Sequence, residues 1–411
     1  MGCGPGPIIL KGDFIYLATS KPTQKSHLPI VNKEGSFLKD TFVVESSGIE
    51  KYPYKVTITF EFNACTTSLE DGANFKDNTD IVIVKYDKIP LARTGGSGRQ
   101  YQGFEGKIKT TAGVPTLLEG TDLSYAFKNV KLASKDFGTL ANLDTKNVTT
   151  MKGMFNLAEN FNQDISNWNM VNVTDTSEMF SGFDREETGF TSVDMVFNQP
   201  LNSWNTANVT DMEDMFAFAV NFNQPLNSWN TANARNMSYM FSDAAAFNQP
   251  LDSWNISNAT PMEFMFYGYK VETNQFISAF NQPLDSWNTS NVTNMGVIFS
   301  GAISFNQPLD SWNTSNAVKM DNMFAPATKF NQDISMWNVK AVETMQKMFE
   351  GASNFNCLDT ATGNIQKWKV SGNTNVTAMF KKSKAMNDTY DGVEGYNADT
   401  GTPTIETFFG K

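Results

Sequence analysis

The sequence predicts an α/β solenoid with one short parallel strand and one short helix per turn of about 25 residues, preceded by a small β-rich domain. The eight tryptophans recur in one frame, and each is followed twelve residues later by a phenylalanine. Residues 1–115 lack this frame and show the alternation of β-strands instead. We therefore expect a β-rich docking or anchoring domain over residues 1–115 and a solenoid over residues 116–411.

The tryptophan frame is the main evidence for the solenoid. Four of the seven gaps between successive tryptophans are 25 residues, and the other three are 36, 33 and 31. The insertions never enter the twelve-residue stretch from tryptophan to phenylalanine, so the spacing is kept where side chains stack and relaxed where the chain turns outside. The predicted structural core contains Trp168, Trp204, Trp229, Trp254, Trp287, Trp312, Trp337 and Trp368.

Each repeat offers one apolar stripe at helical spacing. Met212, Met215, Phe216 and Ala219 lie at i, i+3, i+4 and i+7, which predicts one face of a short helix. Thr260-Pro261-Met262-Glu263 has the order of a helix start, with a hydroxyl cap, a proline and a glutamate. The segment between leucine and tryptophan, as in 226–229, is too short for a second helix, and we expect it to be the parallel strand.

The ends of the repeat array lose the tryptophan. Leu143 stands in its place in one early repeat, and Asn397 does so near the C-terminus. Terminal repeats with a more polar outer face are typical of caps, which we place near 116–142 and 381–411. In the N-terminal domain, residues 41–44, 55–62 and 81–84 have the pattern of strands.

Composition excludes several classes of protein. Lys and Arg number 32 against 43 Asp and Glu, giving a net charge of −11, whereas nucleic-acid binding needs clustered cations. No apolar run approaches the roughly 20 residues of a transmembrane helix. Residues 1–10 lack the charged and apolar regions of a signal peptide. We expect no nucleic-acid partner and no transmembrane segment.

Catalytic and cofactor chemistry lacks its usual residues. His27 is the single histidine and lies in a polar segment between two prolines, so no catalytic triad or paired-histidine metal site is available. The acids at Asp252, Asp285 and Asp310 stand two residues before tryptophan, and aligned carboxylates are one pattern of calcium binding. Asparagine takes the same position in other repeats, which favours hydrogen bonding at a turn. We expect no catalytic residue, no cofactor and no metal.

Two phrases carry a family resemblance. Phe161–Asn169 reads FNQDISNWN and Asn208–Phe216 reads NVTDMEDMF, and both recur in register about eight times over residues 120–410. They resemble the BspA-like leucine-rich-repeat surface proteins, in the 25-residue variant common in mycoplasma-type surface lipoproteins and also present in protists and viruses. The resemblance implies a right-handed leucine-rich-repeat coil, exposed on a surface and used for adhesion or protein recognition without catalysis.

The leading hypothesis is a surface-displayed recognition or adhesion protein, extracellular or on a virion, whose partner is a protein or glycan of a host or cell surface. Inserted loops on a regular scaffold commonly carry specificity. The candidate contact residues therefore lie in the insertions 181–196 and 267–279, and are Asp184, Arg185, Glu186, Glu187, Tyr267, Tyr269 and Lys270.

Two alternatives differ in their partner. Bacterial members of the family usually carry a secretion or lipoprotein signal, and its lack in residues 1–10 favours a virion component. In that hypothesis the solenoid is a capsid or fibre part, and the N-terminal domain docks on a shell protein. A weaker alternative is binding to a regular lattice such as ice or a glycan, from the Asn-Thr-Ala-Asn and Asn-Thr-Ser-Asn stripes at 205–208, 230–233, 288–291 and 313–316.

Overall fold

The computed structural model divides into two compact units, an N-terminal unit of residues 1–199 and a C-terminal unit of residues 200–411. The structure describes residues 9–18, 20–28, 30–32, 39–49, 52–63, 73–75, 81–86, 121–128, 143–184, 191–270, 273–356 and 365–410. The predicted domain boundary at 115/116 lies outside the described residues, and so do residues 1–8. Three of the predicted contact residues, Arg185, Glu186 and Glu187, lie outside them as well.

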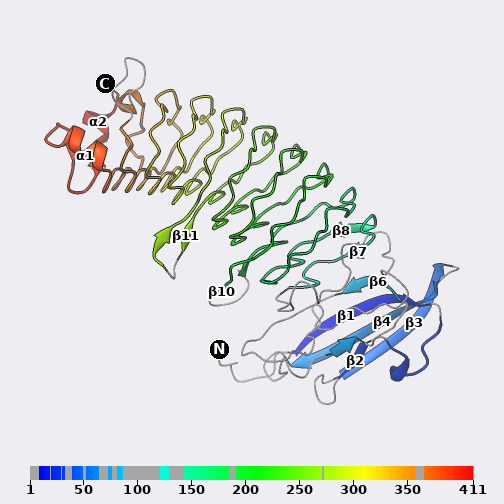
Figure 1. Cartoon of the computed structure of the whole chain (residues 1–411). Helices are drawn as coiled ribbons and strands as arrows, with labels where there is room; N and C mark the ends of the chain where they lie inside the picture. The colour runs from blue at the N-terminus through cyan, green and yellow to red at the C-terminus, as the bar shows by residue number, and fades with distance from the viewer. Residues whose placement is uncertain are drawn as a thin grey trace. The chain divides into compact units, whose positions relative to one another are not determined.

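The strands of the N-terminal unit are short except for four that form an antiparallel sheet (Figure 1). They are β1 (Ile9–Ala18), β2 (Ile30–Asn32), β3 (Lys39–Ile49), β4 (Tyr52–Asn63), β5 (Ala73–Phe75), β6 (Ile81–Tyr86), β7 (Thr121–Asp122), β8 (Val148–Thr150), β9 (Phe183–Asp184) and β10 (Thr191–Ser192), with the 3-10 turn η1 (Lys25–His27). The three segments predicted as strands lie in β3, β4 and β6.

The alternation in β4 gives its sheet one buried face. Val56 and Ile58 are fully buried, and Tyr16, which pairs with Val56 across β1 and β4, is buried on the same side. Thr57, between the two buried residues, is only partly covered. This is the half-buried strand that the period of two predicts.

The sheet of the N-terminal unit changes direction as it meets the first repeats. Its strand order is β3-β4-β1-β6-β7-β8, antiparallel as far as β6 and parallel from β6 through β7 to β8. Thr150, the last residue of β8, then bridges in parallel to Asp175 of the following repeat. The N-terminal sheet therefore supplies the edge on which the first rungs of the repeat region pair.

In the C-terminal unit the same residue of successive repeats pairs in parallel. The bridges join Asp211 to Asn236, then Pro261 to Asn294, and continue through Lys319, Thr344 and Asn375. The predicted strand at Leu226–Trp229 is wrong, because Trp229 N–H donates to Leu226 O at 3.1 Å and closes a turn there. The residues that do pair in parallel, such as Asp211 with Asn236, lie fifteen residues before the leucine that opens the predicted strand, as Asp211 does before Leu226.

The predicted helix is also wrong, although the buried residues were placed correctly. Met212, Met215, Phe216 and Ala219 are all at most 1% exposed. However, alternate backbone N–H groups donate to the next repeat, at 2.8–3.0 Å, from Met212 to Asn236, Asp214 to Ser238, Phe216 to Met240 and Phe218 to Ser242. The intervening N–H groups close turns of three residues. Asp214 and Phe218 have φ of 55° and 59°, which a right-handed helix excludes.

Aromatic rings fill the interior of the C-terminal unit in columns. The tryptophans at 204, 229 and 254 stack at 6.2 Å between centroids, and those at 287, 312 and 337 stack at 6.3–6.4 Å. Two phenylalanine columns run beside them, with Phe216 and Phe222 at 4.1 Å as one pair. All eight predicted core tryptophans are at most 4% exposed. In the N-terminal unit, Phe155 stacks on Phe161 at 3.7 Å in the same manner.

Indole hydrogen bonds hold each repeat to the one before it. Trp312 Nε1 donates to Leu284 O at 2.9 Å, and five other tryptophans do the same: Trp229, Trp254, Trp287, Trp337 and Trp368. The leucine or isoleucine that closes the turn before each tryptophan thus also accepts the next indole. The column is therefore fixed by polar contacts as well as by burial.

The last segment packs against the final phenylalanine of the columns. It holds the 3-10 turn η5 (Ile365–Lys367), α1 (Lys384–Tyr390), the hairpin of β13 (Tyr396–Asn397) and β14 (Thr402–Pro403), and α2 (Ile405–Phe408). Tyr396 and Phe408 both contact the ring of Phe380 at 6.1 Å between centroids. The hairpin of β11 (Tyr269–Lys270) and β12 (Gln275–Phe276) projects from the edge of this unit (Figure 1).

α1 is the longest helix in the described ranges, and its seven residues fall far short of the length that crosses a bilayer.

Candidate recognition site

The stripe that begins with Asn and Thr in each repeat is a hydrogen-bonding device between repeats. Asn205 Oδ1 accepts from Ala207 N–H at 3.2 Å and fixes the local turn. Thr206 is buried, and its hydroxyl donates to Asn230 O of the next repeat at 3.0 Å. The same two contacts recur at 230–232, 288–290 and 313–315. The side chains of the first two residues of the stripe therefore make hydrogen bonds that hold the repeats in shape.

The last asparagine of the stripe faces solvent with one end free for binding. Its Nδ2 donates to a backbone carbonyl of the preceding repeat at 2.7 Å, and this contact recurs at Asn233, Asn258, Asn291 and Asn316. All four residues are exposed. Because the amide N–H is held, each side chain has a fixed orientation and presents its Oδ1 as an acceptor.

These four asparagines are among the residues that line a surface groove of about 670 Å³ in the C-terminal unit. The other lining residues are Arg235, Thr260 and Thr293, each two positions after an asparagine of the row. Backbone bonds join equivalent positions of neighbouring repeats, from Arg235 N–H to Thr210 O at 2.8 Å and from Thr260 N–H to Arg235 O at 3.2 Å. The groove is therefore as regular as the repeats.

The charge of the groove differs from that of the whole chain. The chain carries a net −11, whereas Arg235 is the one charged residue among the residues that line the groove. Arg235 is exposed, and within the described residues its guanidinium makes no ion pair. The groove thus offers amide oxygens, hydroxyls and one cation, and no carboxylate.

A second row of asparagines lies elsewhere on the repeats and is structural. Asn306 Oδ1 accepts from Asn331 N–H at 2.8 Å and from Gln332 Nε2 at 3.0 Å. The same acceptor role recurs at Asn223, Asn248 and Asn281. This row is the Asn-Gln of the repeat phrase, and its amides bind the next repeat instead of solvent.

The first inserted loop does not expose the acid that the sequence singled out. Asp184 is 2% exposed, and its carboxylate lies 2.9 Å from the ammonium of Lys128, which is itself mostly buried. The prediction of Asp184 as a partner contact is therefore wrong. The residue that covers it is 56 positions earlier in the chain, and no local pattern in the sequence indicates this pairing.

The second inserted loop is partly packed. The ring of Tyr269 contacts that of Phe276 across the β11–β12 hairpin, tilted by 50° with 5.2 Å between centroids, and the Tyr269 hydroxyl donates to Asn274 Oδ1. Tyr269 N–H donates to the buried Asp243 at 2.6 Å. Burial, and then the nearby Asp243 carboxylate, raise the pKa of Tyr267 to about 12. The side chain of Lys270 lies outside the described part.

A small aromatic surface adjoins this loop. Tyr239 stacks on Phe264 at 4.4 Å, and Phe264 contacts Tyr267 edge to face at 5.6 Å. All three side chains are half-buried. Because the two tyrosines cover much of Phe264 between them, the cluster offers less apolar area than its three rings would alone.

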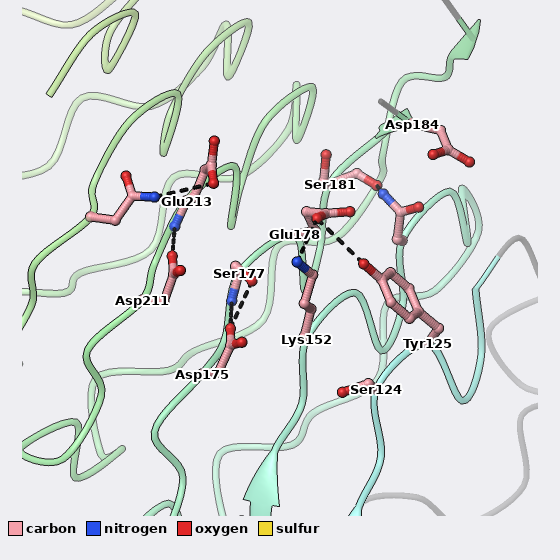
Figure 2. A network of polar contacts seen from close by, with 12 residues as sticks. Ser124, Tyr125, Lys152, Asp175, Ser177, Glu178, Ser181, Asp184, Asp211 and Glu213 are labelled. Atoms are coloured by element: carbon pink, nitrogen blue, oxygen red, sulfur yellow. Dashed lines mark hydrogen bonds and ion pairs between the residues drawn. The ribbon is translucent and has the colours of Figure 1, made fainter. Parts of the chain in front are cut away.

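Polar contacts on the repeat faces join small groups of side chains, as Figure 2 shows around Asp175 and Glu178. Glu178 Oε1 lies 3.4 Å from Lys152 Nζ and 3.5 Å from the Tyr125 hydroxyl. Asp175 accepts from both the backbone and the hydroxyl of Ser177, at 2.9 and 2.7 Å. Glu178 therefore links its repeat to earlier ones, whereas Asp175 fixes a turn within its own repeat.

At the acids before tryptophan, the main chain joins neighbouring repeats. Ser286 Oγ donates to the backbone carbonyl of Asp252 at 2.7 Å, and Ser311 Oγ donates to that of Asp285 in the same way. No group of three His, Cys, Asp or Glu residues within the described ranges is placed to hold a metal ion. His27 is exposed, and its ring nitrogens contact the nearby Thr23 and Gln24.

Sequence reasoning found part of the groove and missed the rest. The stripes at 205–208 through 313–316 contain Asn233, Asn291 and Asn316, which line it. Arg235, Thr260 and Thr293 were not singled out. The sequence signal for these three residues is their constant position, two residues after the asparagine of each repeat. Arg235 stands where the next two repeats have threonine.

Backbone pairing between repeats, a ring-filled interior and inserted loops define a repeat protein. The repeat region matches the family described as "Mycoplasma protein of unknown function, DUF285" over residues 119–196, 187–280 and 271–393, which together exceed half of the chain. The chain belongs to this family. No curated protein and no solved structure matches it.

Proposed function

We propose that this chain is a non-catalytic recognition protein, displayed on a surface, whose repeats form a right-handed solenoid of the BspA-like leucine-rich-repeat kind. The observation that carries the proposal is the recurrence of one exposed polar row, Asn233 to Asn316, in which each Nδ2 is held by a backbone carbonyl of the preceding repeat. A regular scaffold that presents the same side chain at each repeat along an extended outer face suits recognition better than catalysis.

Several contacts support the solenoid. Parallel bridges join equivalent residues of successive repeats, from Asp211 to Asn236 and from Pro261 through to Asn375, and the tryptophan rings stack in the same order as their repeats. The phrases Phe161–Asn169 and Asn208–Phe216 support the finer BspA-like assignment. The family of this chain supports a repeat protein of mycoplasma type, from which display on a surface is the further step that we propose.

The non-catalytic role rests on the residues available. A single histidine excludes the triads and paired-histidine sites that most hydrolytic chemistry uses. Some carboxylates of the repeat faces are engaged with neighbouring side chains, as Glu178 is with Lys152 and Glu213 is with Asn236. A binding role needs neither a nucleophile nor a cofactor.

Surface display is tested on intact source cells or particles. Antibodies raised against the purified chain should label them without permeabilisation, and brief protease treatment of the intact material should remove the label. Recognition is tested by saturable binding of the purified chain to the outer surface of partner cells. Labelling that appears only after permeabilisation would contradict the proposal.

The loops are tested separately with the full chain. Replacing residues 267–279 with a short linker removes the β11–β12 hairpin and leaves the tryptophan columns in place. We expect this variant to lose partner binding if the hairpin is the contact, while circular dichroism shows an intact fold. Unchanged binding would place recognition on the repeats themselves.

A second candidate function is assembly into a virion shell or fibre, and β3 is the observation that favours it. In the described part of the sheet, β3 is an outer strand that pairs with β4 alone. Val43 on this strand is 58% exposed. Exposed edge strands pair readily with further chains. Light scattering after size exclusion distinguishes the two functions, because an assembly component should oligomerise or bind a shell protein.

A further inference from the structure

We propose that the groove of Asn233, Arg235, Asn258, Thr260, Asn291, Thr293 and Asn316 binds an extended oligosaccharide that carries carboxylates, with Arg235 as the carboxylate contact. This inference rests on the proposed recognition function and names the class of ligand. It follows from the kind of polar atom in the groove, from their spacing and from the position of the single charge.

The polar atoms of the groove match sugar hydroxyls. Each asparagine of the row has its Nδ2 held by a carbonyl at 2.7 Å, so its Oδ1 is an oriented acceptor for an O–H donor. Thr260 and Thr293 are exposed, and their hydroxyls both donate and accept. Fixed side chains lose little conformational entropy on binding, which favours a hydroxyl-rich ligand whose individual contacts are weak.

The spacing of these atoms favours a chain instead of a single sugar. Equivalent residues of parallel-paired repeats lie about 4.8 Å apart. The row from Asn233 to Asn316 crosses four repeats, so it offers one acceptor at each step along an extended polymer. A compact ligand would contact the asparagines of one or two repeats and leave the other asparagine acceptors without a hydrogen-bond donor.

Arg235 selects the charge of the ligand. A guanidinium binds a carboxylate through two parallel hydrogen bonds, and Arg235 has no ion-pair partner within the described residues. Further along the same column, Val318 and then Glu343 take the equivalent position, linked by backbone bonds from Val318 to Thr293 and from Glu343 to Val318. The exposed acid at that end disfavours a second anion there, so the carboxylate of the ligand belongs at the Arg235 end.

Other ligand classes fit the groove poorly. Nucleic acid needs several cations along the backbone, and the groove has one. Divalent cations need carboxylates, and the lining has none. A lipid or an apolar peptide needs a hydrophobic lining, which asparagine, threonine and arginine do not supply.

The test measures binding of the full chain to matched pairs of glycans by isothermal titration calorimetry. The pairs are hyaluronan hexasaccharide against chitohexaose, and sialyllactose against lactose. We expect the acidic member of at least one pair to bind more tightly than its neutral match. Arg235→Gln should weaken binding of the acidic glycan about tenfold, because it removes a charge-assisted contact, and should leave the neutral glycan unchanged.

Two further variants separate the groove from general effects. Thr260→Val combined with Thr293→Val should weaken both members of a pair, because it removes hydroxyls and keeps the shape. Lys319→Gln removes an exposed cation outside the groove lining and should change nothing. Circular dichroism of each variant checks its fold.

The inference is overturned if no acidic glycan binds better than its neutral match, or if Lys319→Gln weakens binding as much as Arg235→Gln does. Either outcome leaves the proposed function standing when the chain still labels intact surfaces and binds partner cells. Loss of both surface labelling and cell binding would remove the proposed function itself.

Discussion

Replacing one tryptophan in the middle of the column tests whether the repeats depend on one another. Trp312 is 3% exposed, stacks on Trp287 and Trp337 at 6.4 and 6.3 Å, and lies 5.9 Å from the ring of Phe299. Trp312→Ala removes these contacts and leaves a cavity between two repeats. We expect a loss of about 3–5 kcal/mol in the free energy of unfolding, the usual range for buried tryptophan truncations.

Trp312→Phe separates the ring from its hydrogen bond. It keeps an aromatic side chain but removes the donor to Leu284 O at 2.9 Å. That carbonyl still accepts from Trp287 N–H at 3.1 Å, so it is not left without a partner. The expected loss is therefore about 1–2 kcal/mol, from one net hydrogen bond and a smaller ring.

The assay is guanidinium unfolding followed by far-ultraviolet circular dichroism, because tryptophan fluorescence changes with the substitution itself. Met336→Ala is the matched control, since Met336 is 79% exposed and should cost less than about 0.5 kcal/mol. A Trp312→Ala midpoint no lower than that of Met336→Ala would refute the reasoning.

Three further substitutions test particular contacts. Gly301→Ala should cost about 2–4 kcal/mol, because φ is +75° and the added Cβ would lie 2.2 Å from Gly268 O, whereas Gly372→Ala meets nothing within 4 Å and should be neutral by the same unfolding assay. Asn306→Ala removes an acceptor of two hydrogen bonds from the following repeat and should cost about 2 kcal/mol, while Asn306→Asp keeps both and should cost less. Burial raises the pKa of Tyr267 to about 12, above its ordinary value of 10, so its contribution to stability is complete below pH 10 and is lost as pH rises toward 12. Tyr267→Phe should therefore make the fall in unfolding free energy over that range less steep, and an unchanged slope would contradict it.

The sequence predicted which side chains are buried much better than how the backbone places them. The spacing of Met212, Met215, Phe216 and Ala219 is the same for a helix and for a series of three-residue turns, since both return to one face after three or four residues. What separates them is that alternate N–H groups bond to a repeat 24 residues later. That choice depends on contacts between repeats, which a local pattern does not contain.

The candidate site was partly predictable for a similar reason. The asparagine stripes are visible in the sequence as repeats. The sequence does not show that the first asparagine and the threonine of each stripe bond within the protein while the last asparagine is exposed. Only the contacts show that Thr206 points inward and Asn233 outward. Asp184 was misjudged because its partner Lys128 is distant in the chain, and a cluster of charges ordinarily indicates an exposed loop.

The central claim is that each repeat lies directly on the next one in parallel register, and cysteine crosslinking tests it most directly. The measurement uses the chain with its three native cysteines replaced by serine. Lys319 and Thr344 are bridge partners, so their Cα atoms should lie within the reach of a disulfide, whereas Lys319 and Asn375 are two rungs apart, at about twice the 4.8 Å rung spacing. The account predicts that Lys319→Cys with Thr344→Cys oxidises to an intramolecular disulfide, and that Lys319→Cys with Asn375→Cys does not. Equal crosslinking of the two pairs, or none in the first, would contradict it.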